Sequence, residues 1–136
     1  MKTFWDTNVF IYLIEKQSPL HDRARALFDN HLKGTGELIT SMLTLGELLA
    51  QPLRLNRSDQ VERYIELLSR TERLRLIPFD LSAAERYAAI RAKSSIRQPD
   101  AIQLASAATI GVESFVTNDQ RLWGVIVPGI DAICGL

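Results

Sequence analysis

The chain lacks the features that define several protein classes. Its single cysteine, Cys134, has no partner for an intramolecular disulfide, so a reducing cytosol is the expected environment. No apolar run reaches the roughly 20 residues that a membrane-spanning helix needs. The apolar stretch after Lys2 is interrupted by Asp6-Thr7-Asn8, and no small-residue cleavage site follows it, so no signal peptide is expected. These absences predict a cytoplasmic protein that does not bind membranes.

The chain also lacks net charge. Sixteen basic and sixteen acidic residues cancel, so any surface that binds nucleic acid must be a local patch. Apolar residues make up 46% and charged residues 24%, which excludes a mainly disordered, collagenous or coiled-coil chain. A length of 136 residues suits one domain, spanning residues 1–136.

Several kinds of catalytic site are missing. There is no nucleophile elbow and no Walker loop, and the segment Gly34-Thr35-Gly36 is too short and poorly placed to bind phosphate. The two histidines, His21 and His31, lie on a predicted helix and are remote in sequence from the acidic motifs described below. Surface or packing roles are therefore expected for both.

Hydrophobic patterns predict strands that alternate with helices. The expected strands are Thr3–Trp5, Leu38–Ser41, Leu74–Phe79 and Phe115–Thr117, with Val125–Val127 as a possible fifth. The expected helices are Val9–Ile14, Leu20–His31, Thr44–Ala50 ending at Pro52, one from Ser58, one from Ser82, and Pro99–Ile110. Alternation of this kind predicts an α/β fold with a mainly parallel sheet of four to five strands.

Four carboxylates follow strands or begin helices: Asp6, Glu47, Asp100 and Asp119. Ligand sites in open parallel sheets gather beyond the carboxyl ends of the strands, where all four acids can meet. Carboxylates brought together without a cation repel one another, which raises the pKa of some of them. Oxygen-only ligands suit a hard cation such as Mg²⁺ or Mn²⁺. The pattern therefore indicates a metal-dependent nuclease.

Each acid also has a structural interpretation. Glu47 closes a capping box that begins at Thr44, Asp100 follows Pro99 in a first helical turn, and Asp119 suits a helix cap. Asp6 is harder to explain in this way, because the apolar pairs Phe4-Trp5 and Val9-Phe10 flank it. Asp6 therefore carries most of the functional argument.

These motifs resemble the PIN-domain ribonucleases, and among them the small VapC-type toxins of type II toxin-antitoxin systems. The resemblance covers nearly the whole chain and rests on four motifs in the expected order. They are Asp6-Thr7-Asn8, Thr44-Leu45-Gly46-Glu47-Leu48, Pro99-Asp100-Ala101-Ile102 and Thr117-Asn118-Asp119.

The resemblance implies a three-layer α/β/α domain that hydrolyses RNA with Mg²⁺ or Mn²⁺. Asp6 and Asp100 would be the main metal ligands, and Glu47 and Asp119 would complete the acidic pocket and orient the attacking water. Supporting hydrogen bonds to the carboxylates are expected from Asn8, Ser41 and Thr117. The resemblance also implies a homodimer and a cognate antitoxin that inserts a segment near the pocket.

Residues beyond the motifs leave other possibilities open. Two basic groups, Arg91, Lys93 and Arg97 before Asp100 and Arg54 and Arg57 after Glu47, either line an approach path for RNA or are solvated surface residues. A haloacid-dehalogenase-type enzyme also begins with an Asp after a strand, but its second acid would be Asn8 here. A non-catalytic binding module and a housekeeping processing nuclease remain as alternatives, and the RNA target is not specified.

Overall fold

The computed structural model describes residues 1–136 and contains a central five-stranded sheet. The strands lie in the order β3-β2-β1-β4-β5, and every neighbouring pair is parallel. Their bounds are β1 Lys2–Trp5, β2 Glu37–Ser41, β3 Leu74–Ile77, β4 Val112–Val116 and β5 Ile130–Cys134. The predicted parallel sheet of four to five strands is confirmed.

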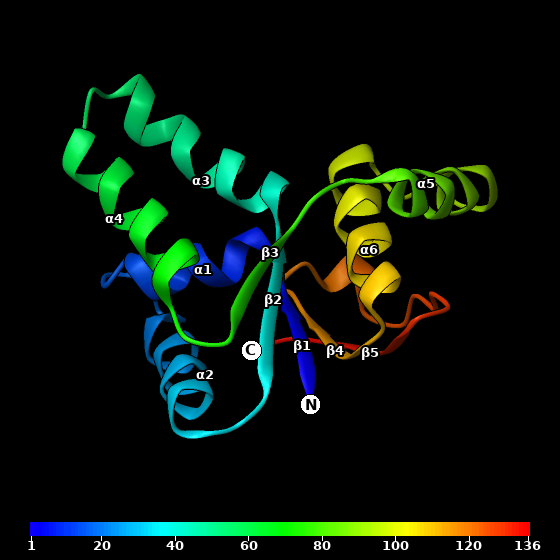
Figure 1. Cartoon of the computed structure of the whole chain (residues 1–136), viewed down its shortest axis with the longest axis horizontal. Helices are drawn as coiled ribbons and strands as arrows, with labels where there is room; N and C mark the ends of the chain where they lie inside the picture. Colours follow the sequence, from blue (N-terminus) through cyan, green and yellow to red (C-terminus); the bar gives the residue numbers. More distant parts are fainter.

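Helices cover both faces of this sheet. They are α1 Thr7–Ile14, α2 His21–Lys33, α3 Met42–Arg54, α4 Ser58–Arg70, α5 Leu81–Lys93, α6 Gln98–Ile110 and the short 3₁₀ helix η1 Gln120–Leu122. Figure 1 shows α1 to α4 on one side of the sheet and α5 and α6 together on the other. This arrangement confirms the three-layer α/β/α fold. No helix has the length and apolar character needed to cross a membrane.

The central strand β1 is buried from both sides. Phe4 packs toward α6 and stacks on Phe115 with ring centroids 5.0 Å apart, whereas Trp5 packs toward α1, where its ring lies 5.3 Å from that of Phe10. Successive strand side chains point to opposite faces, so two adjacent aromatic residues fill both cores. The strand therefore holds the next residue, Asp6, in a fixed position at the carboxyl edge of the sheet.

Helix α3 differs from its prediction at both ends. Ser41 caps it by accepting a hydrogen bond from Thr44 N over 3.3 Å, so the predicted capping box at Thr44 is wrong. The helix also continues through Pro52 to Arg54. A proline removes one helical hydrogen bond, so the sequence predicted that the helix would end there. In the structure Pro52 is buried, and the spacing of residues along the sequence could not predict this burial.

The predicted final strand at Val125–Val127 is also wrong. Residues 130–134 form β5 instead, and Val127 contributes a buried side chain to the core without joining the sheet. The turn before β5 needs Gly129, which has φ of +100° and lies so close to the Ala108 backbone that a Cβ would be 2.6 Å from its carbonyl oxygen. Cys134, at the end of β5, is exposed.

Candidate active site

Three parallel strands deliver acidic or polar residues to one edge of the sheet. Asp6 follows β1 directly, Ser41 at the end of β2 begins the helix that carries Glu47, and Thr117 to Asp119 follow β4. Asp100 arrives from the opposite layer, in the first turn of α6. The shared edge explains why segments far apart in the sequence meet here.

Asp6 is the centre of this group. Its side chain caps α1 by accepting from Thr7 N over 2.8 Å, and its second oxygen accepts from the Thr117 hydroxyl, also over 2.8 Å. Only 7% of the residue is exposed. Burial raises the pKa of Asp6 above its ordinary value, and the negative charges of Asp100 and Glu47 raise it further against the effect of the two hydrogen bonds. The negative charge of this buried carboxylate is therefore poorly balanced by its surroundings.

Hydrogen bonds connect Asp6 to two of the other acids. The Thr7 hydroxyl donates to Oε1 of Glu47 over 2.7 Å, which joins the first helical turn of α1 to α3. On the other side, Asp119 N donates to the Thr117 hydroxyl oxygen over 3.1 Å. Glu47, Asp6 and Asp119 are thus held in one chain of hydrogen bonds.

Asp119 makes a close ion pair with a neighbour. Arg121 Nε lies 2.9 Å from Oδ1 and its terminal nitrogen 2.6 Å from Oδ2, so both carboxylate oxygens accept from one guanidinium. This bonding holds the pKa of Asp119 below its usual range. Asp119 also caps η1 by accepting from Arg121 N, as the structural interpretation of the sequence expected.

Asp100 interacts with the other acids electrostatically and makes no hydrogen bond to them. Its side chain is 18% exposed and accepts no close hydrogen bond, and its nearest cation is Arg97, whose Nε lies 3.8 Å from Oδ2. Burial raises the pKa of Asp100, and the charge of Asp119 adds to this effect, while Arg97 and Arg121 oppose it. Asp6 and Asp100 are therefore the two acids whose ionised forms are least favoured.

Two of the three predicted supporting residues are linked to the carboxylates only through another side chain. Asn8 donates to the Thr117 hydroxyl over 3.2 Å and accepts from Asn118 N over 3.1 Å. The Ser41 hydroxyl donates to Oε1 of Gln103. Neither Asn8 nor Ser41 hydrogen-bonds a carboxylate, whereas Thr117 does.

Gln103 is a site residue that the sequence analysis missed. It is 1% exposed, and its amide donates to Thr44 over 2.7 Å and to Thr7 over 3.2 Å, with Oδ1 of Asp6 at 3.4 Å. The sequence feature that could have identified it is a long polar side chain within the otherwise apolar helix that carries Asp100. Since a buried amide needs partners, such a residue indicates a polar network in the core.

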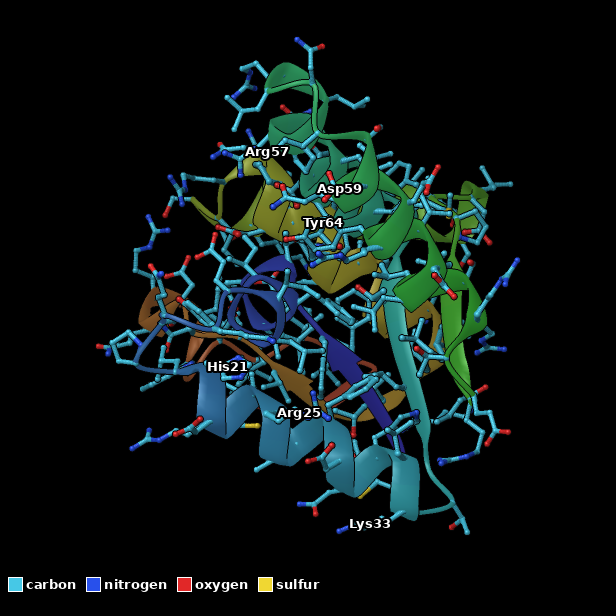
Figure 2. The ribbon with its side chains drawn as sticks, turned by 90° about the vertical axis from the view of Figure 1, so that its left-hand side faces the viewer. His21, Arg25, Lys33, Arg57, Asp59 and Tyr64 are labelled. Atoms are coloured by element: carbon cyan, nitrogen blue, oxygen red, sulfur yellow. The ribbon has the colours of Figure 1, made fainter.

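The histidines have structural partners, in agreement with their expected packing roles. The Nδ1 atom of His21 lies 3.0 Å from Tyr12 O, and Nε2 of His31 lies 2.8 Å from Glu72 O. Figure 2 shows His21 at the start of α2, on the outer face of the α1 to α4 layer. Neither histidine contacts an acid of the site.

The acids do not form a complete metal-ligand cluster in this structure. No three His, Cys, Asp or Glu side chains lie together in a ligand arrangement. Mg²⁺, however, usually takes one or two protein carboxylates and keeps several waters. Asp6 and Asp100 are the two acids of the site whose pKa values are raised, and the charge of Asp100 contributes to the shift at Asp6, so the chemistry of this donor set fits such a cation.

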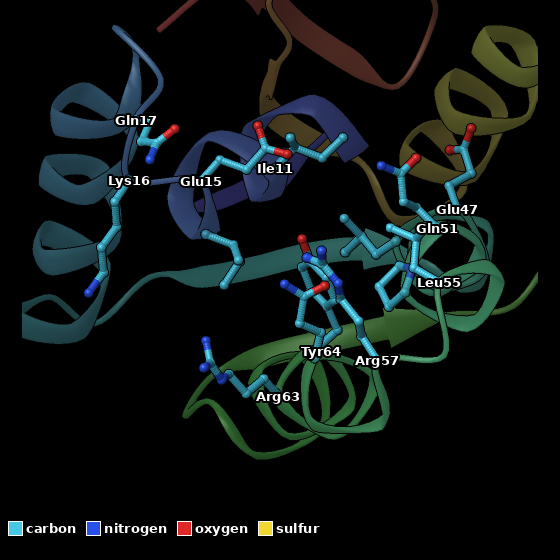
Figure 3. Close-up of a pocket in the computed structure, with 14 residues that line it drawn as sticks. Ile11, Glu15, Lys16, Gln17, Glu47, Gln51, Leu55, Arg57, Arg63 and Tyr64 are labelled. Atoms are coloured by element: carbon cyan, nitrogen blue, oxygen red, sulfur yellow. The ribbon is translucent and has the colours of Figure 1, made fainter.

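A large groove begins beside this site. Its volume is about 840 Å³, and α1, α3 and α4 line it. Figure 3 shows Glu47 and Gln51 at the end of the groove nearest α6, and Arg63 and Tyr64 rising from α4. The apolar part of its wall comes from Ile11, Ile14, Leu48, Pro52 and Leu55.

The fold and the acidic edge together match a known class of protein. The family model of the PIN domain matches residues 3–125, and the chain belongs to this family. Proteins of this family are generally nucleases, and their nucleases typically use divalent metal ions. No curated protein matches the chain by sequence.

The structural neighbours are VapC-type toxins and their complexes. The structure of VapBC2 from Rickettsia felis bound to promoter DNA has a TM-score of 0.78 at 18% identity and covers 100% of this chain and 99% of that one. DNA-bound VapBC from Salmonella typhimurium has a TM-score of 0.66 at 27% identity and covers 99% and 98%. VapC20 from Mycobacterium tuberculosis, a toxin that cleaves the sarcin-ricin loop, has a TM-score of 0.69 at 16% identity and covers 91% and 96%.

Proposed function

We propose that this protein is a metal-dependent endoribonuclease and the toxin of a toxin-antitoxin pair, with residues 1–136 forming one PIN domain that works in the cytoplasm. The observation that carries the proposal is the buried Asp6 carboxylate, whose pKa is raised and which faces the charges of Asp100 and Glu47. A carboxylate so placed gains most from a bound cation. The family's nuclease activity supports the same conclusion.

Asp6 and Asp100 would hold Mg²⁺ or Mn²⁺. When bound, such a cation stabilises the charge that develops on phosphoryl oxygens during hydrolysis. Oε1 of Glu47 accepts a hydrogen bond from Thr7, so Oε2 is available to orient the attacking water and accept its proton. Thr117 fixes the position of Asp6 through its hydroxyl, and Asn8 in turn orients Thr117.

Asp119 would have a different role from the other three acids. Because Arg121 occupies both of its oxygens, it contributes charge near Asp100 and holds the guanidinium at the edge of the site. Ser41 would support the site through Gln103, which contacts both Thr44 and Thr7.

The proposed partners are an RNA substrate, a cognate antitoxin and a second copy of the chain. A protein segment suits the groove, whose apolar wall is open to a partner and whose rim includes Glu47. The neighbours described as VapBC structures support this partner. Leu48 and Leu55 line the groove, and Leu53 is 60% exposed and available for a contact between copies.

Cleavage of a cellular RNA pool by the purified protein tests the proposed activity. Wild type is assayed with Mg²⁺, with Mn²⁺ and with chelator, beside Asp6→Ala and Asp100→Ala. Asp59→Ala is the matched control, because Asp59 lies in the first turn of α4 as Asp100 does in α6, but is exposed and remote in sequence from the four acids.

Metal-dependent cutting that is retained in Asp59→Ala and lost in both site variants is the expected result. Absence of cutting by folded, inhibitor-free wild type under every condition would favour a binding module instead. Cutting that persists in both site variants would mean that the acids do not form the catalytic centre.

A further inference from the structure

A second cavity lies where α5 meets α6, in the helical layer across the sheet from the helices that line the groove. It has a volume of about 290 Å³ and six lining residues, of which only Ile96 is apolar and none is acidic. The others are Arg91, Ser94, Ser95, Arg97 and Gln98. Figure 1 shows α5 and α6 side by side in the layer that carries Asp100. A small cavity lined by two guanidiniums and no carboxylate favours an anion.

The donors of this cavity are largely uncommitted. Arg91 makes no ion pair or side-chain hydrogen bond, and the side chain of Arg97 is 64% exposed with only its 3.8 Å contact to Asp100. Lys93 adds a third cation in the same last turn of α5. The three cations lie within seven residues, so they form a local positive patch on a chain that has no net charge.

Arg97 connects this cavity to the acidic site. It lines the cavity and also lies beside Asp100, so an anion held by Arg91 and Arg97 would be close to the proposed cleavage centre. A strand whose scissile phosphate is at the acids has further phosphates on either side of it. Guanidiniums match phosphate oxygens through paired N–H donors.

We infer that this cavity binds a backbone phosphate of the RNA strand next to the phosphate that is cleaved, an inference that rests on the proposed ribonuclease activity. An acidic protein segment fits less well, because docking of a peptide depends on apolar anchors and the only apolar residue here is Ile96. The groove between α1, α3 and α4 has such anchors, and this cavity does not.

Binding of a fluorescent single-stranded RNA to the full chain in chelator tests the inference without requiring cleavage. Arg91→Gln is the main variant, because Arg91 contacts no acid and its loss leaves Asp100 unaltered. Arg70→Gln is the matched control: Arg70 is an exposed arginine in the last turn of α4, as Arg91 is in α5. Affinity is measured at several salt concentrations.

We expect Arg91→Gln to weaken binding by about 3- to 10-fold and to reduce the slope of log affinity against log salt by about 0.7, the change for one lost phosphate contact. Arg70→Gln should bind like wild type. Equal affinity and slope for the two variants would overturn the inference, and so would a wild type that binds no RNA. Loss of affinity for an acidic protein partner with RNA binding intact would overturn it in favour of that partner.

Cleavage kinetics separate this inference from the proposed function. If wild type cuts RNA with Mg²⁺, Arg91→Gln should raise KM on a long oligonucleotide and leave kcat unchanged. An unchanged KM would overturn the phosphate site while the nuclease stands. If wild type binds RNA through Arg91 but never cuts it, the proposed activity fails and the phosphate site remains.

Discussion

The Thr117 hydroxyl donates its only proton to Oδ2 of Asp6 over 2.8 Å, while Asn8 Nδ2 and Asp119 N donate to the oxygen of the same hydroxyl. A hydroxyl has one donor and two acceptor positions, so Thr117 is fully used. Its proton must therefore point to Asp6. One small side chain thereby joins β4 to the start of α1 and fixes the orientation of the buried carboxylate.

Thr117→Val should be destabilising and less active. Valine has nearly the same shape but leaves the donors of Asn8 and Asp119 without their acceptor, at a cost of about 1–3 kcal/mol. Cleavage should fall about 10-fold, as for other residues that orient metal ligands. Urea unfolding and RNA cleavage measure the two effects. Thr117→Ser keeps the hydroxyl and serves as the control, and equal stability of the valine variant and wild type would contradict this account.

Gln103→Met should also reduce the free energy of unfolding, by about 1–3 kcal/mol, because it leaves the buried hydroxyls of Ser41 and Thr44 without the amide. Activity should fall as well, since Thr7 loses one of the contacts that position it against Glu47. Gln51→Met is the control, an exposed glutamine on α3 whose change should alter stability by less than about 0.5 kcal/mol. An equal effect of the two substitutions would refute the role of the network.

In chelator, stability should decrease as pH rises from the ordinary carboxyl pKa through the raised folded pKa of Asp100. Within that window the folded chain keeps a proton that the unfolded chain has released, so folding becomes less favourable with rising pH. Asp100→Asn removes the titrating group and should flatten this part of the curve. Thermal unfolding across the pH range measures it, and parallel curves for wild type and variant would contradict the prediction.

Mg²⁺ or Mn²⁺ should raise the stability of wild type at neutral pH, because a cation that binds only the folded chain stabilises it by about 2.7 kcal/mol at 100 times its Kd. Chelator should reverse the gain. Asp6→Ala and Asp100→Ala should lose most of it, while Asp59→Ala should retain it in full. A thermal shift of the same size in all four proteins would place the cation elsewhere.

Local sequence predicted the parts of the site that depend on neighbouring residues. An apolar strand followed directly by Asp6, and another followed within three residues by Asp119, placed these acids at the edge of a parallel sheet, and Asp119 does cap a short helix. The pair of Arg121 with Asp119 is equally local, two residues apart, although the sequence analysis did not single it out. Errors arose where burial decides the outcome, as at Pro52 within α3 and at β5.

By itself the sequence determined the fold class, the strand-helix alternation and the four acids, because hydrophobic period and turn chemistry act over a few residues. Only the tertiary structure decided which distant side chains surround Asp6 and the polar network beside it. The contact of Asp6 with Thr117 joins residues 111 positions apart, and that of Gln103 with Thr44 joins residues 59 apart. The groove between α1, α3 and α4 likewise depends on how separate helices pack. Such relationships require the strands to be placed in their spatial order, and spacing along the chain carries no information about which side chains then meet.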